Sequence, residues 1–121
     1  MTDHLTYLAS PYSDPDQNVR RARHDSAKWA FSSLMKAQQL VYSPILHCAA
    51  TAEGCALPTS WDYWEPLDRA MITRCQSISI LTIPGWRESR GVQAEIAIAR
   101  TLGLPIRYVD IDGRYHNQVE P

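Results

Sequence analysis

Short apolar runs alternate with longer amphipathic segments along this chain. Four apolar runs predict strands over residues 5–9, 40–43, 78–83 and 106–109, each bounded by proline, glycine or polar residues. Three intervening segments have apolar residues at spacings of three and four, which predicts helices. We expect these helices from about Asp14 to Gln39, from about Pro66 to Cys75, and from Glu88 or Ser89 to Leu102.

Local chemistry indicates where the helices begin and end. Ser13 or Asp14 is the predicted N-cap of the first helix, with Pro15 near its first position, and Pro66 is expected in the first turn of the second. Gly103 is the expected residue just beyond the end of the third. Residues 44–60 show little periodicity and are expected to form a long irregular loop. The polar tail from Asp110 onward is assigned no element.

The first helix has a predicted buried stripe rich in small residues, which suits close packing on a sheet. The stripe consists of Val19, Ala22, Ser26, Ala30, Ser33, Leu34 and Ala37. Its predicted solvated flank consists of Arg20, Arg21, Arg23 and Lys28.

Strands and helices in strict alternation predict a single α/β domain over residues 1–121, with a parallel sheet of four to five strands between two helical layers. Right-handed crossovers and burial of the first strand favour the strand order 2-1-3-4. In such a sheet ligands bind beyond the carboxyl ends of the strands, where the winding changes direction. The loops expected at that crevice are Ser10-Pro11-Tyr12 and Gly85 to Ser89.

Two carboxylates are predicted to face the packed side of their helices. At about 100° per residue, Glu95 falls in the centre of an apolar stripe, and its helix has its solvent face elsewhere. The stripe consists of Gly91, Val92, Ile98, Ala99 and Leu102. Asp68 falls likewise among Trp64, Met71, Ile72 and Cys75. An inward carboxylate is costly unless it is bound or does chemistry, so both acids are candidate functional groups.

Each acid also has a structural interpretation. Asp68 lies near a predicted helix start and fits a role as a cap or macrodipole partner. Glu95 fits a buried ion pair, with Arg74, Arg87 or Arg90 as its partner. Because both acids converge on one crevice located by topology, we favour the functional interpretation.

The chain contains no nucleophile elbow, no Walker loop and no dinucleotide fingerprint. Paired carboxyls suit glycosidic chemistry, since one can attack an anomeric carbon while the other protonates the leaving group or positions a sugar hydroxyl. The N–H groups around Ser89-Arg90-Gly91, with Arg87 or Arg90, are candidate phosphate ligands. Aromatic residues near these loops are candidates for stacking on a base, although each also fits packing: Tyr12, Trp61, Trp64 and Trp86.

Composition narrows the classes of partner. A formal net charge of −1 argues against a general binder of nucleic acid or anionic membranes. No apolar run approaches the roughly 20 residues that a membrane helix needs, and residues 1–4 lack signal-peptide features, so a cytoplasmic location is expected. Cys48, Cys55 and Cys75 match no common zinc spacing and are expected as reduced thiols, without a metal. No cofactor is expected, because a flavin carrier would need a hydroxyl-rich loop after the first strand.

Three short segments together resemble the nucleoside 2-deoxyribosyltransferase family and its relatives, the deoxyribonucleoside 5′-monophosphate N-glycosidases. They are Tyr7-Leu8-Ala9-Ser10-Pro11, Asp68 eight residues before Gln76, and Ser89-x-Gly91-Val92-x-x-Glu95. With Tyr42-Ser43-Pro44-Ile45 and Gly85 to Gly91, the chain is most similar to a small uncharacterised bacterial branch of that superfamily, up to about Asp110.

The resemblance implies a flavodoxin-like Rossmann-type fold and a homo-oligomer, a dimer or tetramer, whose sites are completed by a neighbouring subunit. It implies that Glu95 is the nucleophile that forms a covalent deoxyribosyl-enzyme and that Asp68 orients the substrate or assists protonation of the base. Tyr7 would line the pocket, and Ser89 and Gly91 would lie at the sugar or phosphate end.

Several positions depart from the family pattern. Ser10 replaces an expected glycine, Pro11 removes one backbone N–H, and Gln76 replaces an acid found in many relatives. The family's C-terminal segment is not recognisable in residues 112–121. Two hypotheses follow: an N-glycosidase or deoxyribosyltransferase acting on a nucleoside or nucleoside 5′-monophosphate, or a non-catalytic nucleotide-binding or sensing protein that uses the same crevice.

Overall fold

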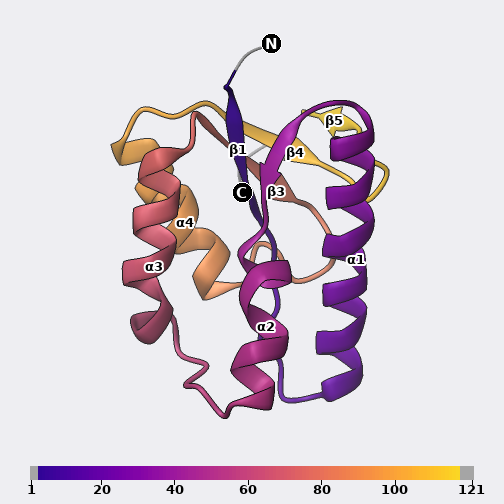
Figure 1. The fold of residues 1–121 in the computed structure, drawn as a ribbon, viewed down its shortest axis with the longest axis vertical. Coiled ribbons are helices and arrows are strands. Elements are labelled where there is room, and N and C mark those ends of the chain that lie inside the picture. The colour runs from indigo at the N-terminus through magenta and orange to yellow at the C-terminus, as the bar shows by residue number, and fades with distance from the viewer. Residues whose placement is uncertain (1–2, 118–121) are drawn as a thin grey trace.

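The computed structural model of the chain describes residues 3–117. Within that range the strands are β1 (Leu5–Ala9), β2 (Leu40–Tyr42), β3 (Ser77–Leu81), β4 (Ile106–Val109) and β5 (Tyr115–His116). The helices are α1 (Gln17–Lys36), α2 (Pro44–Gly54), α3 (Trp61–Arg74) and α4 (Arg90–Thr101). Figure 1 shows their arrangement around the sheet.

All the described strands belong to one sheet with the order β2-β1-β3-β4-β5. The first three pairings are parallel, and β5 pairs antiparallel with β4. The predicted order of the first four strands is therefore confirmed. The fifth strand comes from the tail to which no element was assigned. It follows a tight turn in which the Asp110 side chain accepts hydrogen bonds from the N–H groups of Asp112 and Arg114.

Helices cover both faces of the sheet, so the fold has three layers (Figure 1). Side chains alternate across each strand. One face packs against α3 and α4 through Tyr7, Ile78 and Ile80, while the other packs against α1 through Leu8 and Leu81. This α/β architecture, with one mostly parallel sheet, is Rossmann-like.

The prediction of a long irregular loop over residues 44–60 is wrong, because the helix α2 (Pro44–Gly54) occupies most of this segment. The Ser43 hydroxyl accepts a hydrogen bond from the Leu46 N–H at 3.2 Å, and Pro44 occupies the first helical position. A proline that ends a strand is equally suited to begin a helix, since the first helical N–H has no intrahelical partner. The weak periodicity of the alanine-rich segment that follows concealed the helix.

Other boundaries also differ from prediction. The N-cap of α1 is Asp16 and not Ser13 or Asp14, and the helix ends at Lys36. Pro66 lies inside α3, which begins more than a turn earlier, at Trp61. Trp61 packs against the core cluster, and this burial favours the longer helix despite the backbone donor that Pro66 lacks.

Two predicted helix faces need correction. The buried face of α1 consists of Ala27, Ala30 and Leu34, so the predicted stripe was partly misplaced. This rotation leaves Arg20 and Arg23 half-buried instead of fully solvated. On α4 the predicted stripe residue Leu102 is exposed, because it is the C-cap, where the helix leaves the sheet. Gly103 follows with a φ of +71°, as predicted for a residue that ends a helix.

None of the helices within residues 3–117 has both the length and the apolar character needed to cross a membrane.

Candidate functional site

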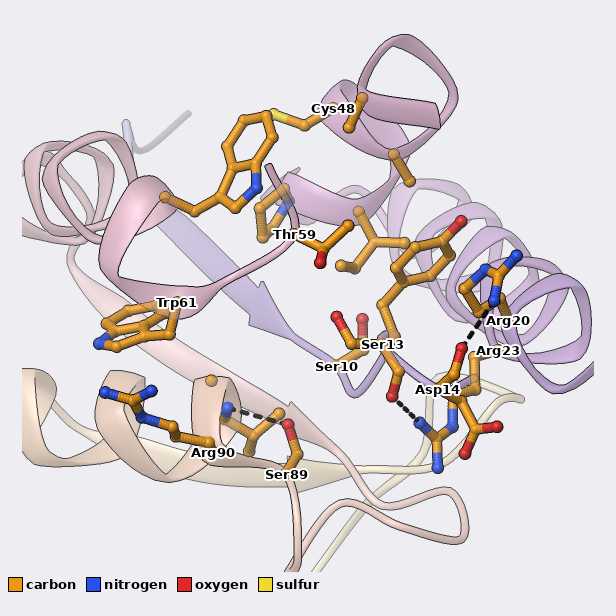
Figure 2. Close-up of a pocket in the computed structure, with 18 of the residues that line it drawn as sticks. Ser10, Ser13, Asp14, Arg20, Arg23, Cys48, Thr59, Trp61, Ser89 and Arg90 are labelled. Carbon is orange, nitrogen blue, oxygen red and sulfur yellow. Dashed lines mark hydrogen bonds between the residues drawn. The ribbon is translucent and has the colours of Figure 1, made fainter. Parts of the chain in front are cut away.

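A cavity of about 950 Å³ lies where the loops after β1 and β3 meet α2, α3 and the start of α4. It occupies the carboxyl end of the parallel strands, which is the position that sheet topology predicts for a ligand. Its volume is typical of pockets for small organic ligands. Figure 2 shows Trp61 and Arg90 on one side of the cavity and Arg20, Arg23 and Asp14 on the other.

Glu95 reaches the cavity from α4. The helix begins after Ser89, whose hydroxyl accepts a hydrogen bond from the Val92 N–H at 3.2 Å. One turn into the helix, Glu95 lies on the same face as Gly91 and Val92, and all three line the cavity. Its side chain is buried, with 4% of its surface exposed. The inward orientation predicted from helical spacing is therefore what the structure has.

Asp68 reaches the same cavity from α3. It shares a helix face with Trp61 and Trp64, and all three line the cavity. Only 7% of Asp68 is exposed, whereas the neighbouring Arg69 is exposed and pairs with Glu65 at 2.6 Å. Asp68 lies in the middle of α3 and not at its start, so the interpretation as a helix cap is excluded.

The arginines considered as partners of Glu95 are engaged elsewhere. Arg74 donates to the carbonyl oxygen of Ala70 at 2.8 Å, and Arg90 pairs with Asp62 at 3.2 Å. The ion pairs found among residues 3–117 include neither Glu95 nor Asp68. Both acids are thus buried at a cavity wall without a cationic partner in the described part of the chain, which is the costly arrangement that favours a functional role.

Tyr7 connects the two acids. Its hydroxyl, buried under the sheet face, donates a hydrogen bond to the Glu95 carboxylate. Burial raises the pKa of Glu95 to about 8, with a smaller contribution from the charge of Asp68, while the hydrogen bond from Tyr7 opposes the shift. Burial also raises the pKa of Asp68 to about 6, again opposed by Tyr7. Burial and the two neighbouring acids raise the pKa of Tyr7 itself, so the phenol remains a donor.

These shifts determine the charge of the pair near neutral pH. Between about pH 6 and pH 8 the two carboxyls together hold one proton and one negative charge. Such a pair offers a nucleophilic carboxylate and a proton donor within one cavity, which is the requirement of retaining glycosidic chemistry.

Seven of the predicted binding residues line the cavity, namely Ser10, Tyr12, Trp61, Trp64, Ser89, Arg90 and Gly91. Ser10 is 6% exposed, and its hydroxyl has no hydrogen-bond partner among the described residues. The Tyr12 hydroxyl donates to the Glu53 carboxylate on α2. The cavity wall is therefore partly held in place by a contact between the loop after β1 and the helix that sequence patterning missed.

Three other predicted binding residues do not form the cavity wall. Tyr7 lies behind Glu95, in contact with the cavity only through that carboxylate. Trp86 is 5% exposed and packs beside Tyr108, with ring centroids 5.7 Å apart. The Arg87 guanidinium stacks over the Trp86 ring at 4.7 Å. Trp86 and Arg87 thus pack against each other and do not line the cavity.

The cavity also contains residues that the sequence did not single out as binding groups. Arg20 and Arg23 come from α1, and Cys48 and Glu53 come from α2. The two arginines were missed because the predicted buried stripe of α1 placed them on the solvated flank. The two α2 residues were missed because their segment was predicted to be an irregular loop. Spacing offered one usable signal, because Arg23, Ala27, Ala30 and Leu34 follow the three-and-four pattern of a single helix face.

Metal-ligating residues do not gather in threes or larger groups within the described part of the chain. Cys48 is the only cysteine of residues 3–117 that lines the cavity. Its pKa is raised, mainly by burial and further by the charge of Asp68, so the thiol is protonated near neutral pH and is a poor metal ligand.

A family described as Domain of unknown function (DUF1937) matches the chain over residues 4–110. That range contains every residue of the cavity wall. Among curated proteins, no relative of the chain is found.

Proposed function

We propose that this chain, which belongs to the DUF1937 family, is an N-glycosidase or deoxyribosyltransferase of flavodoxin-like fold acting on a nucleoside or nucleoside 5′-monophosphate. One observation carries the proposal. Glu95 and Asp68, from two separate helices, are buried in the wall of one cavity, are electrostatically coupled and lack cationic partners within residues 3–117. The resemblance of Tyr7, Asp68, Ser89 and Glu95 to the deoxyribosyltransferase pattern supports it.

In the first step, the Glu95 carboxylate attacks C1′ of the sugar. A bond forms between a Glu95 oxygen and C1′, and the N-glycosidic bond breaks, with its electron pair going to the nitrogen of the base. Asp68 donates its proton to the departing base. The pKa values of about 8 for Glu95 and about 6 for Asp68 place the single proton mainly on Glu95, so the reactive form, with Glu95 ionised and Asp68 protonated, is the minor form of the pair. The Tyr7 hydrogen bond favours the reactive form by stabilising the Glu95 anion.

In the second step, water or a second base attacks C1′ and releases Glu95. Asp68, now ionised, accepts the proton of the attacking nucleophile, so the pair returns to its starting charge. Water gives an N-glycosidase and a second base gives a transferase. Both outcomes use the same two carboxyls.

Aromatic residues beside Asp68 fit the base. Trp61 and Trp64 precede Asp68 by two turns and one turn of α3 and line the cavity with it. The Trp64 indole donates to the carbonyl oxygen of Pro58 at 2.8 Å, which fixes its ring. A base lying against these rings would place its glycosidic nitrogen on the Asp68 side and the sugar on the Glu95 side.

The proposal includes a homo-oligomer, a dimer or tetramer, as the family resemblance implies, and a cytoplasmic location. No metal or cofactor takes part in the two steps, since both carboxyls are supplied by the chain.

The test is release of free base. The wild-type protein and the Glu95→Gln variant are incubated with a panel of nucleosides and nucleoside 5′-monophosphates, and the products are separated by chromatography. We expect base release by the wild type and a loss of at least about 10³-fold in Glu95→Gln, typical for removal of a nucleophile. No release from any member of the panel, combined with nucleotide-dependent thermal stabilisation, would instead support the binding or sensing alternative.

A further inference from the structure

One end of the cavity contains an arginine, Arg23, that has no role in the two proposed steps at Glu95 and Asp68. Arg23 on α1 is half-buried, lines the cavity, and donates from Nη1 to the carbonyl oxygen of Ser13 at 2.9 Å. The neighbouring Arg20 is neutralised by Glu53 at 2.9 Å, but the ion pairs within residues 3–117 do not include Arg23. A guanidinium has five N–H donors, and among the described residues the Arg23 guanidinium donates one hydrogen bond, to Ser13.

Ser10 supplies a second, independent indication of a ligand-binding position. It lies just after β1, its side chain is more than nine-tenths buried, and its hydroxyl lines the cavity without a partner in the described chain. Buried hydroxyls in native structures are nearly always hydrogen-bonded, so an unpaired one at a cavity wall points to a group that binds there.

The backbone near Arg23 leaves room for its side chain. Gly85, in the loop after β3, has a φ of +96°, and a Cβ at this position would lie 2.4 Å from Arg23 Nη2. Any larger residue would displace the guanidinium. Glycine therefore allows the cation of α1 to reach across to the opposite loop at the carboxyl end of the sheet.

We infer that Arg23 and Ser10 bind the 5′-phosphate of a nucleoside monophosphate, so that the nucleotide and not the free nucleoside is the substrate class of this cavity. The inference rests on the proposed function for the position of the sugar at Glu95. This phosphate position differs from the one expected from sequence, where the N–H groups around Ser89-Arg90-Gly91 and the side chain of Arg87 or Arg90 were the candidate phosphate ligands. The Ser89 hydroxyl already accepts from Val92, Arg87 lies outside the cavity wall, and Arg90 is exposed and paired with Asp62.

The arrangement of the cavity fits such a ligand. Base and phosphate extend from different corners of a nucleotide's sugar, C1′ and C4′, with the phosphate linked to C4′ through C5′ and O5′. Trp61 lies on one side of the cavity and Arg23 on the other, with Ser10 between them (Figure 2). A phosphate dianion would accept charge-assisted hydrogen bonds from the Arg23 guanidinium and from the Ser10 hydroxyl. The nearby Asp14 carboxylate accepts a hydrogen bond from the Asp16 N–H at 2.9 Å.

Calorimetric titration with paired ligands tests the inference. Every protein in the titration also carries Glu95→Gln, which prevents turnover. The four deoxynucleoside 5′-monophosphates and their nucleosides are titrated into the otherwise wild-type chain, Arg23→Gln, Arg23→Lys, Ser10→Ala and the control Arg21→Gln, an exposed arginine of the same helix outside the cavity wall. We expect Arg23→Gln to weaken monophosphate binding by about 10- to 100-fold, the size of a hydrogen bond to a charged group, with nucleoside binding unchanged. Arg23→Lys should recover part of the loss, and Arg21→Gln should match the wild type.

Ser10→Ala covers the case in which Arg23→Gln fails to fold, because it removes only an unpaired oxygen and should bind monophosphates more weakly in a fully folded protein. Equal binding of monophosphate and nucleoside by the wild type, or equal monophosphate binding by Ser10→Ala and the wild type, would overturn the inference. So would an absence of binding across the panel. If binding depends on Arg23 but base is never released, the inference stands and the N-glycosidase proposal fails. If base is released with no preference for monophosphates, the N-glycosidase proposal stands and the phosphate inference fails.

Discussion

The Tyr7 hydroxyl donates a hydrogen bond to the Glu95 carboxylate, and it thereby joins the buried strand β1 to the helix α4 at the cavity wall. Both side chains are almost completely buried, and the residues are 88 positions apart in sequence. The bond favours the ionised form of a carboxyl that burial would otherwise keep protonated. The first prediction follows from this relationship.

Tyr7→Phe should move the pH dependence of base release toward higher pH. The hydrogen bond lowers the pKa of Glu95 and of Asp68, so its removal raises both. We expect kcat to fall by about 10- to 100-fold at pH 7, the scale of one lost charge-assisted hydrogen bond. The measurement is a pH–rate profile of kcat/KM for the wild type and the variant. A profile of unchanged position would show that Tyr7 does not set the charge of the pair.

Asp68→Asn should shift the Glu95 limb of the profile in the opposite direction. The negative charge of Asp68 raises the pKa of Glu95, and a neutral amide removes that contribution. The variant also lacks the proton donor, so its rate should fall most for bases that leave poorly without protonation and least for good leaving groups. Rates for several nucleotides with different bases provide the readout. A uniform loss across leaving groups would argue against Asp68 as the acid.

Stability should depend on pH through the same two acids. The pKa of Glu95 is about 8 in the folded chain against an ordinary value of 4.5, so the folded state binds this proton more tightly than the unfolded state. The contribution of Glu95 to stability is therefore largest at low pH and is lost as pH rises from about 4.5 to about 8, by at most about 1.4 kcal/mol per pH unit. Asp68 adds the same sign of effect between its ordinary 3.8 and about 6.

Urea unfolding of the wild type and Glu95→Gln at pH 5, 6.5 and 8 would measure this dependence. The variant keeps an oxygen that accepts from Tyr7 but cannot ionise, so its stability should fall less with pH and exceed that of the wild type at pH 8. Parallel pH curves for the two proteins would mean that Glu95 is not held with a raised pKa.

Ser89→Ala should separate a structural role from a binding role. The Ser89 hydroxyl caps α4 by accepting from the Val92 N–H, and its loss should lower the free energy of unfolding by about 1 kcal/mol. Ser43 caps α2 in the same way and lies outside the cavity wall, so Ser43→Ala is the matched control. If the phosphate binds at Arg23, both variants should lose similar stability and retain similar monophosphate affinity. A loss of monophosphate affinity in Ser89→Ala but not in Ser43→Ala would indicate that the phosphate binds at the start of α4 and not at Arg23.

Much of the sheet and of the acidic pair is predictable from local patterning. The strands at residues 5–9 and 106–109 are short apolar runs bounded by polar residues, proline or glycine. Gly103 follows the last helix with a positive φ, a backbone conformation that glycine adopts readily. Glu95 and Asp68 stand out because a 3.6-residue period places each among apolar neighbours. Helical periodicity depends only on residues within one helix, and both acids lie in helices with a clear apolar period, so each could be recognised from sequence.

The rest of the site depends on contacts that no local pattern encodes. Pro44 ends a strand and begins a helix equally well, so α2 and the cavity wall it supplies were missed. The small residues of α1 fit more than one stripe, and only packing on the sheet selects the one that turns Arg23 inward. The bond from Tyr7 to Glu95 and the approach of Arg23 to Gly85 join distant segments, and neither leaves a mark in the spacing of nearby residues.

The central claim is that Glu95 forms a covalent bond to the sugar, and mass spectrometry after incubation with 2′-deoxy-2′-fluoro nucleotides tests it most directly. Fluorine beside C1′ disfavours the oxocarbenium-like transition states and slows turnover of the intermediate, so the adduct accumulates. The account predicts a mass increase of one fluorinated sugar phosphate, mapped by fragmentation to Glu95 and absent from Glu95→Gln. Base release without any adduct, or an adduct on another residue, would contradict it.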